Sequence, residues 1–387
     1  MPVFGTTTVR LDAATGRTLR QSVHAERDQP PFDRVMMDGI AVSFTDFDGG
    51  LRRYPIQSIQ SAGDPALTLE DGKCIEIMTG APLPDNADCI IPVERITVAD
   101  NIAAIEADYS AEQHQFIHAR GSDHIQGTEL LLSGRRISPM DIAIIASCGL
   151  ADVTASEIPS VAVISTGNEL VPAGKPVDAH QIRMSNGPAV VAMLHDHGYE
   201  NCQHDHIVDD RKLLKERIAA HLLNAKVLVL SGGVSMGRAD YIPQVLGELG
   251  TRVVFHKVSQ RPGKPMWFGI GPDNQAIFAL PGNPVSTLIC CRQYVIPALS
   301  AASGFGATSH EFANLATEVE FKPQLTCFLP VKIASAIDGK QLALPVHTNT
   351  SGDFASLSGT DGYVELDLKT SKFPAGSGVP LHRWYSK

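Results

Sequence analysis

Hydrophobic positions in the middle of the chain alternate between short β-branched runs and longer segments with helical spacing. The runs 161–166, 227–231 and 276–280 predict buried strands, and 185–198, 210–225 and 285–304 predict helices that follow strands. This alternation predicts a doubly wound α/β domain with a largely parallel sheet over residues 157–305. Ligands of such sheets bind at the carboxyl ends of the strands, so we expect the glycine-bearing loops after these three runs at one edge.

The flanking regions follow a different pattern. Short apolar runs separated by Gly, Pro and Asp predict an inserted β-rich module over residues 32–119 and a small β-barrel-like domain over residues 306–387. Residues 1–31 and 120–156 are expected to form one discontinuous linker domain. Its helix should begin at Ser138 and Pro139 and end at Gly149. The predicted fold class is α/β with added β domains.

Composition narrows the functional classes. The 387 residues carry a formal net charge of −10, which argues against general nucleic-acid binding. Seven cysteines without a CxxC pair argue against a disulfide scaffold or a zinc ribbon. No continuous apolar run reaches the length of a membrane span, and the N-terminus lacks a signal-peptide pattern, so we expect a cytoplasmic protein that binds no membrane.

The segment 226–241 carries the strongest chemical signal. A buried strand stops at Ser231, and small residues then let backbone N–H groups approach an anion closely. The alternative is a tight turn without a ligand, but two similar loops in the same domain favour an anion site. The candidate loop residues are Ser231, Gly232, Gly233, Ser235 and Gly237.

Three cations lie around a Pro-Gly turn on this acidic chain. Lys257, Arg261 and Lys264 are either a solvated basic loop or an oxyanion site held on a stiff backbone. Because the net charge is negative, we favour the oxyanion site.

Four carboxylates are candidates for holding a hard cation. Glu169 and Asp240 follow strand ends, and Asp209 lies between a strand and a helix, where it could instead be an N-cap. Mg²⁺ takes one or two carboxylates together with substrate phosphate and water. Asp38 lies in the inserted module, so it can reach this edge only across a domain or subunit interface.

The sequence also contains two histidine pairs and lacks a hydrolase motif. His195 and His197, like His204 and His206, have the composition of metal ligands, but the first pair falls at a helix end, where the rings do not converge easily. We interpret these four histidines as solvated or capping residues. No GxSxG elbow is present, which argues against triad hydrolysis.

An ordered set of motifs resembles one family. PPFDRVMMDGIAV, IMTGAPLPDNADCIIPVE, VAVISTGNEL, VLVLSGGVSMGRADY, RPGKPMWFG and LPGNPVSTL occur in this order between about residues 30 and 290. Together they resemble the molybdopterin molybdenumtransferase family, known as MoeA, to which the gephyrin E domain belongs. The segment TSGDFASLSGTDGYVEL resembles the last domain of that family.

The resemblance implies an elongated four-part subunit that forms a homodimer through the discontinuous linker domain. It implies that molybdate is inserted into adenylyl-molybdopterin with release of AMP and with Mg²⁺ as cofactor. Expected partners are the small-molecule substrates, a molybdopterin adenylyltransferase and apo-molybdoenzymes. The implied catalytic residues are Asp38, Thr79, Glu169, Asp209, Asp240, Lys257, Arg261 and Lys264, of which Glu169, Asp209 and Asp240 hold the metal. The implied cofactor-binding residues are Ser165, Thr166, Gly167, Ser231, Gly232, Gly233, Ser235, Gly237, Pro281, Gly282, Asn283, Pro284 and Ser286.

The chain departs from the family pattern at several positions. Ile40 replaces the usual aromatic after MDG, Arg261 replaces the first lysine of KPGKP, and TCFLPVKI has no arginine beside its Leu-Pro. One alternative function stays open, a divergent paralogue that binds molybdopterin or its cofactor as a carrier or scaffold without inserting metal. The inserted β-rich module and the C-terminal domain argue against an adenylyltransferase of the same fold, because that activity resembles single-domain proteins. The sequence does not distinguish molybdate from tungstate.

Overall fold

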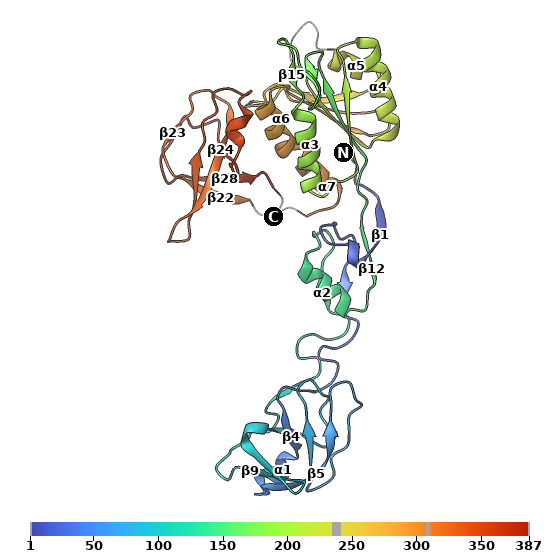
Figure 1. The fold of residues 1–387 in the computed structure, drawn as a ribbon, viewed down its shortest axis with the longest axis vertical. Helices are drawn as coiled ribbons and strands as arrows, with labels where there is room; N and C mark the ends of the chain where they lie inside the picture. The colour runs from blue at the N-terminus through green and yellow to red at the C-terminus, as the bar shows by residue number, and fades with distance from the viewer. Residues whose placement is uncertain (1, 234–240, 307–309, 386–387) are drawn as a thin grey trace.

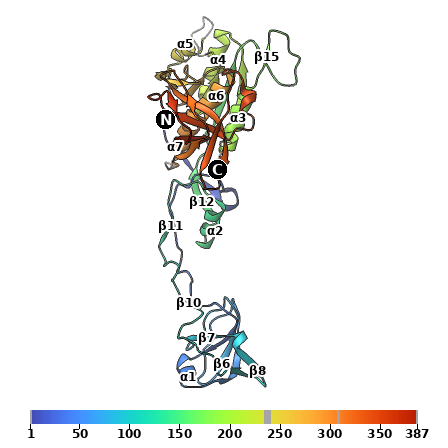
Figure 2. The same ribbon diagram turned by 90° about the vertical axis from the view of Figure 1, so that its left-hand side faces the viewer.

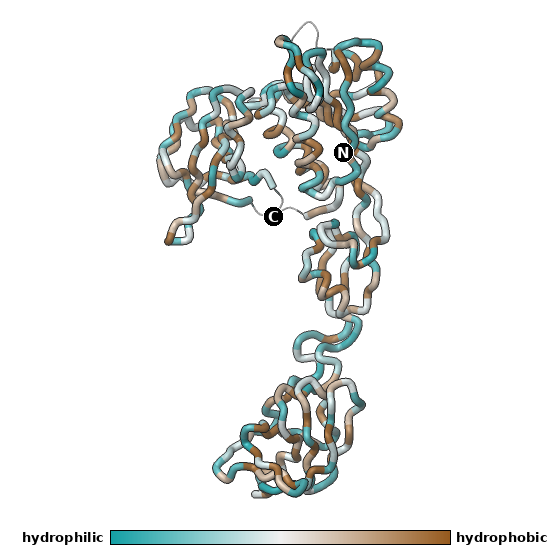
Figure 3. Tube along the Cα trace, in the orientation of Figure 1, coloured by the Kyte–Doolittle hydropathy of each residue, from teal (hydrophilic) through white to brown (hydrophobic). Residues whose placement is uncertain are grey.

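The computed structural model describes residues 2–233, 241–306 and 310–385 of an elongated molecule. A β-rich module lies at one end, and a slender middle part connects it to an α/β domain with a β-barrel beside it (Figure 1). The view turned by 90° shows the same separation between the two ends (Figure 2). In Figure 3 the segments between module and middle part are mainly hydrophilic, and the hydrophobic segments lie within the folded parts.

The α/β domain is built on a six-stranded sheet in the order β16-β13-β17-β21-β20-β18. The first four strands are parallel, and the last two are antiparallel to their neighbours. The predicted doubly wound, largely parallel sheet is therefore confirmed. The strands are β13 Val161–Thr166, β16 Cys202–Ile207, β17 Val227–Ser231, β18 Arg252–His256, β20 Trp267–Ile270 and β21 Ala276–Leu280.

Helices cover both faces of this sheet because successive side chains of each strand point to opposite faces. Val227 and Val229 of β17 pack in a cluster with helices α3, α6 and α7, whereas Leu228 and Leu230 pack with α4 and α5. The helices are α3 Asn186–Asp196, α4 Arg211–Asn224, α5 Ile242–Glu248, α6 Pro284–Cys290 and α7 Ile296–Ala302.

The predicted helix 285–304 is one long element with an irregular centre. A π-helical turn, Cys291–Val295, separates α6 from α7. By length and composition alone, Pro284–Ala302 could cross a membrane, and 56% of that stretch is buried inside the protein. Core helices of soluble proteins pass the same test, so this is weak evidence for a span.

The distal module contains a six-stranded sheet in the order β7-β4-β6-β5-β9-β8. Ile40, where the family pattern has an aromatic residue, is fully buried in its core. The elements are β4 Gly39–Val42, α1 Phe44–Asp48, β5 Arg53–Gln60, β6 Cys74–Ile77, β7 Cys89–Pro92, β8 Ile96–Ala99 and β9 Ile102–Ile105.

The middle part combines two distant stretches of the chain. Strand β1 Thr6–Arg10 pairs with β12 Asp152–Ser156, and β2 Val23–His24 pairs with β11 Glu129–Leu131. Helix α2 Pro139–Ser147 begins with a capping box between Ser138 and Asp141, and Gly149 follows its end with φ +74°. Residues from both stretches share one hydrophobic cluster. This supports the discontinuous domain, whose boundaries we keep as a proposal.

The C-terminal region forms a closed β-barrel. Strands β24, β25, β22, β28 and β26 pair in that order, and β26 pairs back to β24. The short β19 Gln260–Arg261 of the α/β domain adds to β24 in parallel. The barrel strands are β22 Glu311–Leu315, β24 Thr326–Ser335, β25 Gln341–Pro345, β26 Gly362–Leu366 and β28 Gly378–Arg383. The predicted β-barrel-like domain is thus confirmed.

Candidate active site

A cavity of about 430 Å³ opens at the carboxyl edge of the parallel strands, and we name it the edge cavity. Its walls come from the three predicted strand ends and their loops, with Ser165 and Thr166 at the end of β13 and Glu169 after it, Ser231 at the end of β17 and Gly232 after it, and Gly282 to Pro284 after β21. These strands are parallel neighbours, so their small-residue loops meet at one edge, as expected. Gly167 lies in the loop after β13, and Ser235, Gly237 and Asp240 lie outside the described residues.

Two polar atoms in this wall lack a hydrogen-bond partner among the described residues. The Asn186 side-chain amide donates to Ser231 Oγ at 3.0 Å and to the Gly282 carbonyl at 2.7 Å, but its Oδ1 is buried without a hydrogen bond. Thr166 Oγ1 is buried without a partner as well. An unsatisfied buried polar atom costs about 1–3 kcal/mol, and such atoms in a cavity wall are available to a ligand.

The two glycines after β17 are required by close packing. A Cβ on Gly232 would lie 2.6 Å from the Thr166 carbonyl oxygen, and one on Gly233 would lie 2.7 Å from Ile242. Both glycines also have positive φ, +100° and +66°. The loop can therefore lie this close to Thr166 only with glycine in these places.

Two of the candidate histidines lie behind the edge cavity and interact locally. His204 Nε2 is 3.0 Å from Ser165 Oγ, and His206 Nε2 is 2.9 Å from the Gly167 carbonyl. Desolvation lowers the pKa of His204. His197 turns its Nδ1 to the Met193 carbonyl of its own helix. Within the described residues, no group of three or more His, Cys, Asp or Glu could hold a metal ion.

The carboxylates follow neighbouring strands of the sheet. Glu169 follows β13 and lines the edge cavity, and Asp209 follows β16, where its N–H donates to Asn168 Oδ1 at 3.0 Å. The alternative role of Asp209 as the cap of α4 is wrong. Asp210 caps that helix, since its carboxylate accepts from the Leu213 N–H at 2.8 Å.

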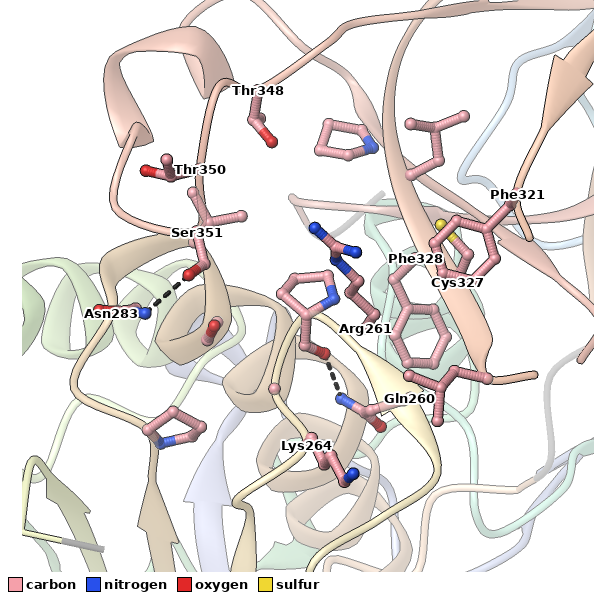
Figure 4. A pocket seen from close by; sticks show the side chains of 18 of the residues that line it. Gln260, Arg261, Lys264, Asn283, Phe321, Cys327, Phe328, Thr348, Thr350 and Ser351 are labelled. Atoms are coloured by element: carbon pink, nitrogen blue, oxygen red, sulfur yellow. Dashed lines mark hydrogen bonds between the residues drawn. The ribbon is translucent and has the colours of Figure 1, made fainter. Parts of the chain in front are cut away.

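A second cavity, of about 550 Å³, lies between the α/β domain and the barrel, and we name it the turn cavity. Arg261 and Lys264 line it (Figure 4). Arg261 reaches toward the loop that carries Thr348, whereas Lys264 leaves the turn in another direction. The structure therefore brings these two cations to one cavity without making them converge.

Buried Gln260 holds the turn in place. Its amide donates to the Pro262 carbonyl at 2.9 Å, and its Oε1 accepts from the Tyr294 hydroxyl. A Cβ on Gly263 would lie 2.4 Å from Cys290 Sγ. Lys257 lies further along the same hairpin, where its N–H donates to the Met266 carbonyl, and it does not line the turn cavity.

The loop 281–284 separates the two cavities. Pro281 lines the turn cavity, Gly282 and Pro284 line the edge cavity, and Asn283 lines both. Asn283 also donates to Ser351 Oγ of the barrel domain at 2.6 Å (Figure 4). Ser286, one turn into α6, lines the turn cavity. The two cavities are thus neighbours with a common wall.

Asp38 and Thr79 form a separate pair in the distal module. Asp38 Oδ1 accepts from the Thr79 N–H at 2.6 Å and from the Thr79 hydroxyl at 2.7 Å. These hydrogen bonds lower the pKa of Asp38. Asp38 directly precedes β4, which lies at the opposite end of the molecule from the α/β domain (Figure 1). Within one chain, this pair does not meet either cavity.

Sequence reasoning missed two wall residues. Asn186 begins helix α3, and Ser351 belongs to the barrel domain, so both come from outside the glycine-bearing loops. The segment Arg183-Met184-Ser185-Asn186 of the edge-cavity wall offered a signal, since two polar groups and an amide precede a helix.

Comparison with known proteins identifies the family. Three sequence profiles match in order: the MoeA N-terminal region (domain I and II) over residues 2–149, a probable molybdopterin binding domain over 162–301, and the MoeA C-terminal region (domain IV) over 313–384. A molybdopterin molybdenumtransferase of Synechocystis is 37% identical over 385 residues, which cover 99% of this chain and 96% of the relative. The chain belongs to the MoeA family of molybdopterin molybdenumtransferases.

Further relatives agree with this membership. A molybdopterin molybdenumtransferase of Synechococcus elongatus is 35% identical over 81% of this chain and 79% of its own length. The crystal structure of a molybdopterin biosynthesis MoeA protein from Pyrococcus horikosii has 29% identity and a TM-score of 0.82, covering 100% of this chain and 96% of that one. As a MoeA family member, the chain is a transferase of molybdenum cofactor biosynthesis.

Proposed function

We propose that this enzyme inserts molybdate into adenylyl-molybdopterin and releases AMP. The observation that carries the proposal is the common wall of the two cavities: the edge cavity is rich in hydroxyl, amide and glycine backbone groups, and the turn cavity contains Arg261 and Lys264. A pterin in the edge cavity and molybdate in the turn cavity would face each other across Asn283. Bringing two reactants together in this way removes much of the entropic barrier to their reaction.

The edge cavity is proposed to bind the pterin and its phosphate. The unpartnered Asn186 Oδ1 and Thr166 Oγ1 can accept hydrogen bonds from the N–H groups of a pterin ring. Backbone N–H groups of the small-residue loops suit phosphate. The proposed cradle comprises Ser165, Thr166, Gly167, Ser231, Gly232, Gly233, Ser235, Gly237, Pro281, Gly282, Asn283, Pro284 and Ser286.

The turn is proposed to bind molybdate, a tetrahedral dianion. Arg261 offers a planar fork of donors and Lys264 a compact charge, and Lys257 adds positive charge along the same hairpin. On a chain with a net charge of −10, such a local group of cations offsets the repulsion of an anionic substrate. Tungstate has the same shape and charge and is expected to compete.

Glu169, Asp209 and Asp240 are proposed to hold Mg²⁺. The described donors fit the ion, because Glu169 and Asp209 supply carboxylate oxygens from adjacent strand ends and Mg²⁺ needs only one or two of them beside phosphate and water. When bound, the ion would neutralise charge on the phosphoanhydride. Glu169 and Asp209 orient the ion, and the glycine loops keep the phosphate close to backbone donors.

We further propose a cytoplasmic homodimer in which the distal module of one subunit completes the site of its partner. The support is that Asp38 and Thr79 form an exposed acceptor pair far from both cavities of their own chain. A molybdopterin adenylyltransferase that supplies the substrate and apo-molybdoenzymes that receive the product are the proposed protein partners.

An assay with adenylyl-molybdopterin, Mg²⁺ and molybdate tests the reaction. The wild-type enzyme should release AMP and form active cofactor, and Glu169→Gln and Asp240→Asn should release AMP at least tenfold more slowly. If the wild type binds the pterin tightly but releases no AMP, the carrier function is correct instead.

Mixed dimers test the shared site. Asp38→Asn and Glu169→Gln chains should each be inactive alone, whereas a mixture should regain about a quarter of wild-type activity, since half of the dimers are mixed and each has one intact site. Activity that stays absent in the mixture, with mixed dimers verified by mass, would contradict the proposal.

A further inference from the structure

A third cavity, of about 650 Å³, lies where three parts of the protein meet, and we name it the junction cavity. Arg136 comes from the segment before α2, His197 and Arg292 come from the α/β domain, and Glu311 and Arg383 come from the barrel. None of these residues lines the edge cavity or the turn cavity. A ligand here would touch all three parts at once.

Two arginines give this cavity its charge. Arg383 donates to both carboxylate oxygens of Glu311, so these two charges cancel. Arg136 donates to the His197 carbonyl at 2.6 Å, and Arg292 donates to the Arg383 carbonyl at 2.6 Å. Within the described residues, neither Arg136 nor Arg292 has a carboxylate at ion-pair distance. Each guanidinium carries five N–H donors, so most of them remain for a ligand.

One nitrogen of the His197 imidazole also lacks a partner among the described residues. The residue is only 6% exposed, and its Nδ1 lies 2.9 Å from the Met193 carbonyl, which can only accept a hydrogen bond. The proton of the neutral ring therefore sits on Nδ1, and Nε2 keeps a lone pair. That buried Nε2 has no hydrogen-bond partner among the described residues. An acceptor left in this state costs about 1–3 kcal/mol, so a ligand that satisfies it is favoured.

We propose that the junction cavity binds the phosphate group of a small molecule. Phosphate supplies anionic oxygens for the two guanidinium forks, and its singly protonated form also supplies a P–OH that can donate to Nε2. A carboxylate or a sulfate has no such proton at neutral pH. Phosphate therefore satisfies the arginines and the imidazole together.

A phosphate bound in the junction cavity would hold together the parts of the protein that meet there. Arg136 belongs to the middle part that leads to the distal module, while Arg292 already contacts the barrel through the Arg383 carbonyl. An anion held by both arginines links these contacts and stabilises the angle between the parts. This role is independent of the proposed metal insertion, which takes place at the other two cavities.

Titration of the full-length enzyme with inorganic phosphate tests the site. In an Arg261→Gln, Lys264→Gln background, which removes the turn cavity as a competing site, we expect calorimetry to detect phosphate at the junction cavity in addition to any phosphate held by the glycine loops of the edge cavity. Arg292→Gln and Arg136→Gln in that background should each weaken phosphate binding at the junction cavity at least tenfold. Arg95→Gln is the matched control, because Arg95 pairs with Glu106 in the distal module. Arg292→Lys, which keeps the charge, should lose less than Arg292→Gln and guards against a folding defect.

The results of this titration decide whether phosphate binds in the junction cavity and which source of phosphate is bound. Phosphate binding that is absent in the background, or unchanged by both Arg292→Gln and Arg136→Gln, would overturn the proposal. Parallel titration with AMP separates the sources of the phosphate group. Tighter binding of AMP that is equally sensitive to Arg292→Gln identifies a phosphate ester, and equal or weaker binding identifies the free ion.

A comparison of phosphate with sulfate tests the role of the imidazole. The charged and titratable groups near its ring are Arg292, Arg136 and Asp196, and His310, Glu311, Arg383 and Tyr385 also line the cavity. At pH 7.5 phosphate should bind at least tenfold more tightly than sulfate. Burial lowers the pKa of His197, so the difference should shrink only as the pH falls below the ordinary imidazole value of about 6.5 and Nε2 gains its own proton. In His197→Gln this pH dependence should disappear. Equal affinities for the two anions at pH 7.5 would contradict the hydrogen bond to Nε2.

Discussion

The edge cavity and the turn cavity share the loop 281–284 but differ in chemistry. The edge cavity offers hydroxyl groups, two amides and glycine backbone beside Glu169 and Arg183, and two of its polar atoms have no partner among the described residues. The turn cavity offers Arg261 and Lys264 beside the aromatic rings of Phe321 and Phe328 (Figure 4). Neutral donors and acceptors suit a polar heterocycle, and guanidinium and ammonium groups suit a dianion.

This difference explains how one site can hold two anionic reactants. Arg261 and Lys264 give the turn cavity its positive charge, and the hydroxyl groups and amides of the edge cavity can bind the ring by shape and hydrogen bonds. The common wall at Asn283 then brings the reacting groups to a boundary, where neither has to enter the other's cavity. Substitutions in the two cavities should consequently have separable effects on molybdate use and on pterin affinity.

The largest effect is expected from removing both cations of the turn cavity. Arg261→Gln with Lys264→Gln should raise the molybdate concentration needed for half-maximal activity at least a hundredfold, because charge-assisted hydrogen bonds contribute about 1.5–3 kcal/mol each. Pterin affinity, measured by fluorescence titration, should change less than threefold. Lys73→Gln, a lysine paired with Glu70 in the distal module, is the control. An equal loss of pterin affinity would mean that the two cavities act as one.

The next effect concerns the backbone of the edge cavity. Gly232→Ala places a Cβ 2.6 Å from the Thr166 carbonyl oxygen at φ +100° and should lower the free energy of unfolding by about 2–4 kcal/mol. Pterin binding should fall as well, because Thr166 is displaced. Gly247→Ala is the matched control, since a Cβ on this helical glycine would meet no atom within 4 Å and alanine favours helices. Urea unfolding measures both, and similar stabilities for the two variants would refute the close-packing argument.

The sheet could be predicted from the sequence because residues that are neighbours in the chain mark each of its strands. The β-branched runs ending in Ser165-Thr166 and Ser231 marked both the strands and the edge where their loops meet. The Ser138-Pro139 start of α2 was equally local, since a cap involves residues three apart. The cap of α4 was assigned one residue too early, because adjacent Asp209 and Asp210 have the same local preference and only the chain path separates them.

What the sequence could not predict depends on contacts between distant segments. Asn186 reaches the edge cavity only because α3 packs beside β13, and Ser351 reaches the turn cavity only because the barrel docks on α6. The junction cavity depends even more on contacts between distant segments. Its two arginines, Arg136 and Arg292, are far apart in the chain.

Substitutions in the common wall of the two cavities should have a smaller effect on activity, and the two residues that are hydrogen-bonded there should share it. Asn283→Ala or Ser351→Ala removes the hydrogen bond between them and should cost about 1 kcal/mol, seen as a several-fold loss in kcat/KM for molybdate. The double variant should lose little more than either single variant, because both remove the same bond. Ser377→Ala is the control, since its hydroxyl donates to the Pro374 carbonyl within its own turn. Fully additive losses would show that the two residues act independently.

The smallest effect is a pH dependence that comes from behind the edge cavity. Desolvation lowers the pKa of His204 in the folded protein, so below the ordinary imidazole value of about 6.5 the unfolded chain binds more protons than the folded one. The contribution of His204 to stability is therefore complete above about pH 6.5 and is lost as the pH falls toward the lower folded value. His204→Gln should flatten the fall in unfolding free energy between pH 7 and pH 5, whereas His180→Gln, which removes an exposed imidazole, should not. Because Ser165 Oγ lies 3.0 Å from His204 Nε2, pterin affinity should follow the same pH range, while the molybdate requirement of the turn cavity should not. A parallel pH response of both substrates would show that the common wall couples the cavities more tightly than their separate chemistry implies.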